Sequence, residues 1–138
     1  MIKLLFLCTG NSCRSQMAEG YARQLGNNKV AVKSAGIVAH GKNPRAIAIM
    51  KEDGIDISDQ ESTKLSEEML KWSDWVVTVC GHADEQCPTL PSGIQKQHWP
   101  LEDPAKATGT EEEITAKFRE VRDEVKKRTK SLLAELVR

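Results

Sequence analysis

The chain has 138 residues, a length that suits one domain with its own buried core, and we treat residues 1–138 as a single domain. Its 20 basic residues balance its 20 acidic ones, which is not typical of a protein that binds nucleic acid non-specifically. The longest apolar run, LLFL, is too short to span a membrane, and the N-terminus lacks the apolar stretch of a signal peptide. We therefore expect a cytoplasmic monomer with no membrane partner and no nucleic-acid partner.

Strand and helix signals alternate along the first part of the chain. Lys3–Leu7 (KLLFL) is an apolar run that predicts a buried strand. Apolar residues at helical spacing predict a helix from about Arg14, and Gly26 is expected to end it. Val30–Val32 predicts a second strand, which would end at 34–36.

The later elements are predicted from helix caps and from one β-branched run. They are a helix from Asn43–Pro44 to Gly54, a short helix from Ser66 to about Trp72, a strand at Trp75–Val79 and a helix from a Thr110–Glu113 capping box to about Val137. The stretch His82–Ala107 is expected to be loop-rich, with a short strand near His98–Trp99. The alternation of strands and helices predicts an α/β fold, in which a parallel sheet carries helices on both faces.

The segment after the first predicted strand has the composition of an anion-binding loop. A loop that leads from a strand into a helix directs several backbone N–H groups to one point, with the positive end of the helix dipole behind them. Gly10 is expected to allow an unusual backbone angle there, and Asn11 to tolerate the left-handed region. The loop that we expect to wrap around an oxyanion consists of Thr9, Gly10, Asn11, Ser12, Cys13, Arg14 and Ser15.

Cys8 and Arg14 indicate the chemistry of this loop. The positive field at a helix N-terminus lowers a thiol pKa, so we expect Cys8 to be a thiolate nucleophile near neutral pH. Arg14 can donate two parallel hydrogen bonds to a tetrahedral oxyanion. A Cys-x5-Arg spacing also arises by chance, but the apolar strand before it and the amphipathic helix after it favour an enzyme that attacks a phosphate-like anion with sulfur.

The remaining cysteines, Cys13, Cys80 and Cys87, allow several interpretations. In a chain without an export signal they are expected to be reduced, and small buried hydrophobic residues are the alternative to a catalytic role. Zinc binding is less favoured, because the spacings Cys-x4-Cys and Cys-x6-Cys are not those of common zinc sites and the histidines show no paired spacing. Cys80 ends a predicted strand, as Cys8 does, so we expect these two to face one site. Cys13 is interpreted as a non-catalytic residue that packs at the helix start.

Six segments resemble the low-molecular-weight protein tyrosine phosphatase superfamily, and most of all its thioredoxin-coupled arsenate reductase branch: CTGNSCRSQMAEG, SAGIVAHG, GIDIS, VVTVC, HWPLEDP and VRDEV. They extend over essentially the whole chain. The resemblance implies a phosphatase-like fold with a four-stranded parallel sheet, Cys8 as nucleophile and Arg14 as oxyanion binder. It also implies that Asp103, which by itself looks like a turn residue before Pro104, is the general acid.

The resemblance further implies a relay of three thiols. Cys8 would attack arsenate, Cys80 would attack Cys8 as arsenite leaves, and Cys87 would then attack Cys80. Thioredoxin would reduce the final Cys80–Cys87 disulfide, with no organic cofactor bound. Phosphate and sulfate would compete with arsenate, and some phosphatase activity would remain. The polar segment between Cys80 and Cys87 has few apolar residues, so it can rearrange at modest cost.

Two other functions stay open at this point. Tyrosine phosphatases of this superfamily usually offer aromatic side chains around the pocket and a tyrosine after the Asp-Pro pair, whereas Ala105 follows that pair here. A bare rim suits a small inorganic anion better than a phosphotyrosine ring. A non-enzymatic module that binds an anion or a partner is the third class, and it would need no second or third cysteine.

Some relatives bind a potassium ion through residues that match Asn11, Glu19 and Ser34, together with an aspartate. Thr63 stands at the aspartate position in this chain, and a neutral oxygen in place of a carboxylate weakens a site for a hard cation. The resemblance therefore implies at most a weakened potassium site. The alternative is that Glu19 lies on a solvated helix face.

Overall fold

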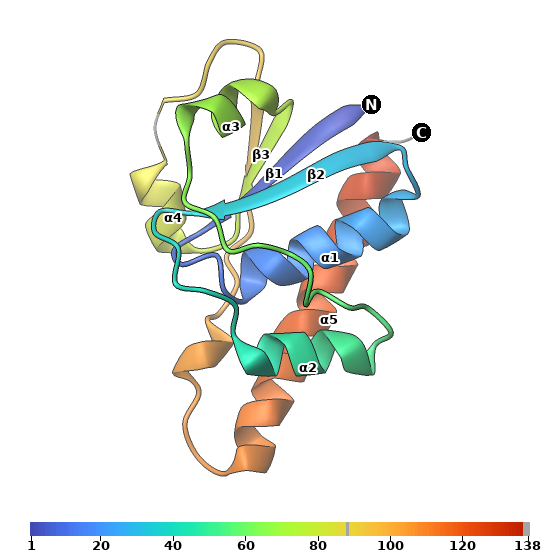
Figure 1. The fold of residues 1–138 in the computed structure, drawn as a ribbon, viewed down its shortest axis with the longest axis vertical. Coiled ribbons are helices and arrows are strands. Elements are labelled where there is room, and N and C mark those ends of the chain that lie inside the picture. Colours follow the sequence, from blue (N-terminus) through green and yellow to red (C-terminus); the bar gives the residue numbers. More distant parts are fainter. Residues whose placement is uncertain (88, 137–138) are drawn as a thin grey trace.

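Four parallel strands form one sheet in the computed structural model, which describes residues 1–87 and 89–136. The strands are β1 (Ile2–Cys8), β2 (Val30–Gly36), β3 (Trp75–Thr78) and β4 (Gln95–His98). Their order is β2–β1–β3–β4, so β1 lies in the middle, and its last residue, Cys8, pairs with Gly36. This arrangement confirms the predicted α/β fold with a four-stranded parallel sheet (Figure 1).

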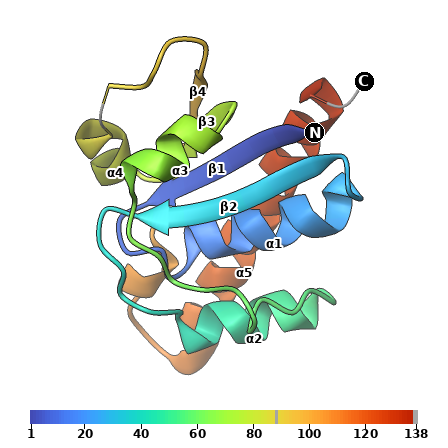
Figure 2. The ribbon, with the colours of Figure 1, turned by 45° about the horizontal axis from the view of Figure 1, so that its top comes forward.

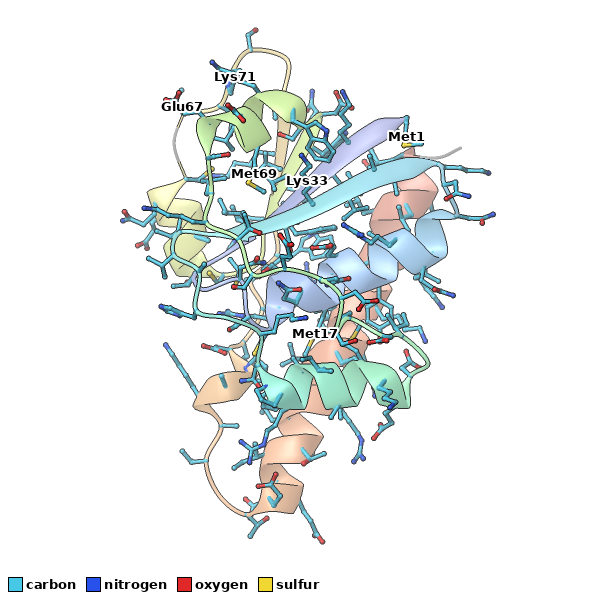
Figure 3. All side chains as sticks on the ribbon, viewed as in Figure 1. Met1, Met17, Lys33, Glu67, Met69 and Lys71 are labelled. Atoms are coloured by element: carbon cyan, nitrogen blue, oxygen red, sulfur yellow. The ribbon has the colours of Figure 1, made fainter. Side chains whose placement is uncertain are left out.

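Helices cover both faces of the sheet. They are α1 (Arg14–Gly26), α2 (Pro44–Glu52), α3 (Glu67–Trp72), α4 (Gly81–Gln86) and α5 (Glu111–Leu136), with a short 3₁₀ helix, η1, at Pro104–Lys106. Figures 1 and 2 show α1 and α5 together on one face with α2 beyond them, and α3 and α4 on the other face. Figure 3 shows Lys33 of β2 on the α3 side, where its Nζ lies 4.6 Å from the centre of the Trp72 ring. None of the helices described is long and apolar enough to cross a membrane.

The central strand carries the core. Leu4, Leu5, Phe6 and Leu7 of β1 are completely buried. A parallel strand in the middle of a covered sheet has neighbours on both faces, which is why the run is continuously apolar instead of alternating. The ring of Phe6 lies 5.6 Å from that of Trp99, so the chain that leaves β4 packs against β1.

The predicted helix caps are confirmed. The side chain of Asn43 accepts a first-turn N–H of α2 at 2.8 Å, and Ser66 does the same for α3 at 3.3 Å. Thr110 Oγ1 accepts the Glu113 N–H at 3.1 Å, and the Glu113 carboxylate accepts the Thr110 N–H at 3.5 Å, so the capping box is formed. The predicted end of the last helix, Val137, lies outside the described residues.

Ion pairs hold α2 against α5. Glu52, at the end of α2, lies 2.8 Å from Arg119 and 2.9 Å from Arg122 of α5, and Arg122 also donates to the carbonyl of Ile49 at 3.0 Å. Because α2 begins directly after residues 37–43, these contacts fix one end of a segment that borders the site described below.

Gly26 ends α1 for a reason other than the predicted one. It is the last helical residue, and the left-handed residue that terminates the helix is Asn27, with φ of 46°. A Cβ on Gly26 would lie 2.4 Å from Val30 Cγ2, so glycine is needed to let β2 approach the helix end.

The prediction of loop-rich structure after β3 is wrong at its start, because Gly81–Gln86 form the helix α4. This helix has only six residues, and Ala83 is the buried one among those described, so its apolar pattern is too short to be recognised. The predicted short strand lies earlier than expected, at Gln95–His98.

Candidate active site

A cavity of about 580 Å³ opens where β1 and β3 end, beside the starts of α1 and α4. The predicted site residues that line it are Cys8, Thr9, Gly10, Ser12, Cys13, Arg14, Cys80 and Asp103. Its other lining residues are Ala105, which the sequence places at the rim, and His40, Gly81 and Lys106, which it does not mark. Gly81 directly follows Cys80, and Lys106 lies in the same 3₁₀ helix as Ala105, whereas His40 comes from a distant loop whose local sequence carries no signal for the site. The lining does not include Asn11, Ser15 or Cys87.

The backbone of the loop is turned so that its N–H groups face the cavity. Four of its carbonyls accept backbone N–H groups of residues 37–43 on the outside: Cys8 from Ile37 at 3.1 Å, Thr9 from Val38 at 3.0 Å, Gly10 from His40 at 2.9 Å and Ser12 from Asn43 at 3.1 Å. In a trans peptide, the carbonyl and the N–H of the next residue point in opposite directions. The N–H groups of residues 9, 10, 11 and 13 are therefore directed inward, and they form a ring of donors for an oxyanion.

Asn11 holds the turn of this loop. As predicted, its backbone is left-handed, with φ of 50°. Its buried side chain donates through Nδ2 to Ser15 Oγ at 2.8 Å and to Ser34 Oγ at 2.9 Å. Its Oδ1 accepts the Thr63 N–H at 2.8 Å. Asn11 and Ser15 thus support the loop from behind.

Gly10 is needed for space, and not for the unusual angle that was predicted, since its φ is not left-handed. A Cβ on Gly10 would lie 2.4 Å from Nδ1 of His40. Glycine therefore lets the imidazole of His40 pack directly on the loop at the rim of the cavity.

Arg14 closes the ring of donors and brings Asp103 to it. The guanidinium is buried, donates from Nη1 to the carbonyl of Leu101 at 3.0 Å and lies 3.6 Å from the Asp103 carboxylate through Nη2. Within the described part of the chain, its buried Nε–H has no hydrogen-bond partner. Buried donors are nearly always satisfied, so this one is an exception among the described residues. Asp103 also accepts the Ala105 N–H at 3.0 Å, so the turn role expected of an Asp before proline is present as well.

Cys80 caps α4 with its sulfur and lies against Cys8. Its Sγ accepts the Ala83 N–H at 3.3 Å and lies 3.1 Å from Thr9 Oγ1. The hydrogen bond from the Cys8 thiol is the largest of several effects that lower the pKa of Cys80 to about 5. The Thr9 hydroxyl, the Ala83 N–H and the Arg14 charge act in the same direction, against burial of the sulfur. The same thiol–thiol hydrogen bond, together with burial, raises the pKa of Cys8.

This coupling bears on the predicted thiolate. The hydrogen bond between the two thiols lowers the pKa of Cys80 and raises that of Cys8, and the expectation that Cys8 is the thiolate that attacks stays a prediction. Once one of two adjacent thiols is ionised, its negative charge opposes ionisation of the other, so the pair keeps one proton at neutral pH. Since the two sulfurs share a hydrogen bond, that proton can pass from one to the other, and either can become the nucleophile.

Cys13 lies at the N-cap of α1 and lines the cavity, whereas we expected it to pack into the helix start. Burial raises the pKa of Cys13 to about 11, so it stays a thiol at neutral pH. Its protonation is consistent with the interpretation that it is not catalytic.

Replacing Thr9 by valine is expected to raise the pKa of Cys80 by about one unit, since a hydrogen bond to a charged group contributes about 1.5 kcal/mol. Because the folded protein lowers this pKa, losing the donor moves thiolate formation to higher pH. The ultraviolet absorbance of the thiolate, followed against pH, measures the shift. Thr9→Ser keeps the hydroxyl and should titrate like the unchanged protein, and an equal titration for Thr9→Val would exclude Thr9 as the donor.

Cys80 and Cys87 stand at opposite ends of α4, as its N-cap and its C-cap. Seven residue steps along a helix separate two Cα atoms by roughly 10 Å, whereas a disulfide needs less than about 7 Å. A Cys80–Cys87 disulfide therefore requires α4 to unwind. Cys87 is half-buried and lies outside the cavity lining, so only such a rearrangement can connect it with the site.

Asn11, Glu19 and Ser34 do lie together, but they do not fit a potassium ion. Glu19 is buried; one of its carboxylate oxygens accepts the Ser34 hydroxyl at 2.5 Å, and the other lies 2.7 Å from Arg23. The carbonyl oxygen of the Asn11 side chain is already taken by the Thr63 N–H. A hard cation needs several free oxygens, and here Arg23 supplies the positive charge instead. Over residues 1–87 and 89–136, no group of three His, Cys, Asp or Glu side chains could hold a metal ion.

Comparison with known proteins agrees with this geometry. Residues 3–138 match the family model described as low molecular weight phosphotyrosine protein phosphatase. An arsenate reductase of Halalkalibacterium halodurans is 56 % identical over 128 residues, covering 93 % of this chain and 92 % of the relative. A solved arsenate reductase in the phosphate binding state has a TM-score of 0.81 at 40 % identity, with 98 % of each chain covered. A thioredoxin-dependent arsenate reductase of Corynebacterium glutamicum has a TM-score of 0.80 at 26 % identity, covering 98 % of this chain and 61 % of that one.

A cysteine at the base of a ring of backbone donors defines a phosphatase-like enzyme that works through sulfur, and the chain belongs to the low molecular weight phosphotyrosine protein phosphatase family. Within this family, its similarity places it in the arsenate reductase subgroup. The resemblance noted in the sequence is thereby confirmed.

Proposed function

We propose that the protein reduces arsenate to arsenite by a relay of Cys8, Cys80 and Cys87, and that thioredoxin recycles it. One observation carries the proposal: a second sulfur, Cys80, lines the same oxyanion cavity as Cys8 and is electrostatically coupled to it. Hydrolysis of a phosphate ester needs one sulfur and a water molecule. Reduction needs two electrons from thiols, and an adjacent second thiol supplies them.

In the first step, arsenate binds in the ring of N–H groups with Arg14 against its oxygens. The proton of Cys8 passes to the Cys80 thiolate across their hydrogen bond, and Cys8 attacks arsenic. Asp103, 3.6 Å from the Arg14 guanidinium, is the proposed general acid that protonates the leaving oxygen, which departs as water. The product is an arsenic–sulfur adduct on Cys8 that the donor ring stabilises.

In the second step, Cys80 gives up its proton to an oxygen of the adduct and attacks the Cys8 sulfur. The sulfur–arsenic bond breaks, its electron pair stays on arsenic, and trivalent arsenite leaves. Cys87 then attacks Cys80 and frees Cys8, and the Cys80–Cys87 disulfide is reduced by the two thiols of thioredoxin. Each cycle thus moves two electrons from thioredoxin to arsenic.

The proposed function also implies an oligomeric state, a compartment and a set of competing anions. The enzyme acts as a monomer with one domain over residues 1–138, a length that suits a single core. The relay needs reduced thiols and thioredoxin, so we place it in the cytoplasm. It needs no bound organic cofactor. Phosphate and sulfate, which share the tetrahedral shape of arsenate, compete for the ring.

Consumption of NADPH by thioredoxin reductase, thioredoxin, this protein and arsenate tests the function, with each component omitted in turn. Sustained oxidation that requires all four components is the expected result. Rapid hydrolysis of an aryl phosphate without arsenate-dependent oxidation would make the protein a phosphatase.

Hydrolysis of phosphotyrosine is the second candidate, because an oxyanion ring with a cysteine serves both reactions. The residues at the rim of the cavity favour arsenate, which is smaller than a phosphotyrosine side chain. Ala105 follows Pro104 there and is exposed, and the described lining residues include no phenyl, phenol or indole ring that would stack on a tyrosine. We therefore expect only residual phosphatase activity.

A further inference from the structure

The peptide between Asn11 and Ser12 is held in a different way from its neighbours in the oxyanion loop. The other loop carbonyls described above accept backbone N–H groups of residues 37–43. The carbonyl of Asn11 instead accepts Nε2 of Gln16, at 3.1 Å. Gln16 lies in the first turn of α1, is completely buried and is not part of the cavity lining. A side-chain amide therefore decides which way this one peptide faces.

A second glutamine fixes the orientation of that amide. Nε2 of Gln60 donates to Oε1 of Gln16 at 2.8 Å and to the backbone carbonyl of Gln16 at 3.0 Å. Nε2 of Gln16 also donates to the carbonyl of Glu61 at 2.9 Å. With Oε1 facing a donor and Nε2 facing two carbonyls, every polar atom of the buried amide is satisfied in one orientation only. Turning the amide round would place its oxygen against both carbonyl oxygens.

We infer that Gln16 and Gln60 are positioning residues for oxyanion binding, because they hold the Asn11–Ser12 peptide with its carbonyl outward and the Ser12 N–H toward the anion. The carbonyl and the following N–H of a trans peptide are opposed, so the outward hydrogen bond to Gln16 directs the Ser12 N–H into the cavity that Ser12 lines. If this peptide turned over, a carbonyl oxygen would face the bound anion in place of a donor. The inference rests on the proposed oxyanion site, but not on the redox relay.

Gln60→Glu is the variant that tests this inference. Gln60 is only half-buried, so a carboxylate is tolerated there. The carboxylate offers acceptors alone, so it draws Nε2 of Gln16 to itself and leaves Oε1 facing the Asn11 carbonyl. We expect the Kd for inorganic phosphate to rise about tenfold, which is the size of one lost hydrogen bond to a charged group. In the unchanged protein the Ser12 amide resonance should move strongly when phosphate is added, and in Gln60→Glu this movement should be lost.

Two controls separate this effect from charge and from loss of packing. The double variant Gln60→Glu/Glu61→Gln restores the net charge next to the loop but leaves the carboxylate at position 60. Gln60→Leu removes the donor without adding an acceptor, so Gln16 keeps its orientation against two carbonyls, and we expect a loss of at most about threefold. Gln95→Glu makes the same chemical change at the start of β4, at the opposite end of the sheet, and should bind phosphate normally.

The expected result is a loss for Gln60→Glu that the double variant retains and that exceeds the loss for Gln60→Leu. Recovery of normal affinity in the double variant would mean that charge alone acts at a distance, and it would overturn the inference. A larger loss for Gln60→Leu than for Gln60→Glu, or an unchanged Ser12 shift, would also overturn it. Since phosphate binding is measured without turnover, a failure of arsenate reduction in the unchanged protein would leave this test intact.

Discussion

Cys8→Ser is expected to reduce arsenate-dependent NADPH oxidation and aryl phosphate hydrolysis to background together. A serine hydroxyl stays protonated near neutral pH, so it is a much weaker nucleophile toward arsenic than a thiolate, and its oxygen cannot form a disulfide. The ring of backbone donors and Arg14 do not depend on the sulfur, so phosphate should still bind. Measuring both activities and the phosphate Kd on one preparation separates loss of the nucleophile from loss of the site.

Cys13→Ser is the matched control, because it changes the other buried thiol of the same loop. It should keep measurable turnover in both assays, because burial keeps the Cys13 thiol protonated and Cys80, the sulfur that can accept a proton, lies against Cys8. Arsenate turnover by Cys8→Ser would refute the assignment of the nucleophile. Such turnover together with inactive Cys13→Ser would transfer that role to Cys13.

Cys87→Ser is expected to limit each protein molecule to a single arsenate. The first two steps use Cys8 and Cys80, so one equivalent of arsenite should form and the protein should then stop as the Cys8–Cys80 disulfide. The cavity lining does not include Cys87, so phosphatase activity should be unaffected. Rapid-quench measurement of arsenite per protein molecule gives the stoichiometry, and mass spectrometry of the digested product locates the disulfide.

The position of Cys80 and Cys87 at the two ends of α4 adds a second readout to this prediction. In the unchanged protein, the oxidised product should lose the protection of the α4 amides in hydrogen exchange, because the helix must unwind before the two sulfurs can meet. In Cys87→Ser no such disulfide forms. Normal multiple turnover of Cys87→Ser with thioredoxin would show that the three-cysteine relay is wrong.

Local sequence was sufficient for the parts of the site that are contiguous in the chain. Cys8 and Arg14 bracket a loop between an apolar run and an amphipathic helix, and the strand, the loop and the helix are where that pattern predicts them. Cys80 could be brought to the same site from topology alone, because two parallel strands end at one edge of the sheet. These inferences need only periodicity and the direction of the strands.

Other parts of the site depend on contacts that no local pattern carries. Asp103 was identified through the family resemblance, because its approach to Arg14 is set by packing between distant segments. The helix α4 is too short to show a period, and its cap is a cysteine sulfur instead of a common capping residue. The lowered pKa of Cys80 depends first on the Cys8 thiol and then on the donors Thr9 and Ala83, which come from separate segments, so it requires their coordinates.

The way in which residues 37–43 hold the oxyanion loop has a consequence for the substitutions that this chain can tolerate. The contacts are made by the backbone N–H groups of residues 37, 38, 40 and 43, and every amino acid except proline has such a group. Apart from His40, which packs on Gly10, Gly41, whose φ is 83°, and Asn43, which caps α2, side chains in this segment can therefore vary while the donor ring keeps its shape. Proline at any of these four positions would release one loop carbonyl and let a donor of the ring turn away. A substitution in this outer segment that keeps the backbone N–H leaves the hydrogen bond to the loop in place, whereas a substitution by proline at one of the four donor positions removes it.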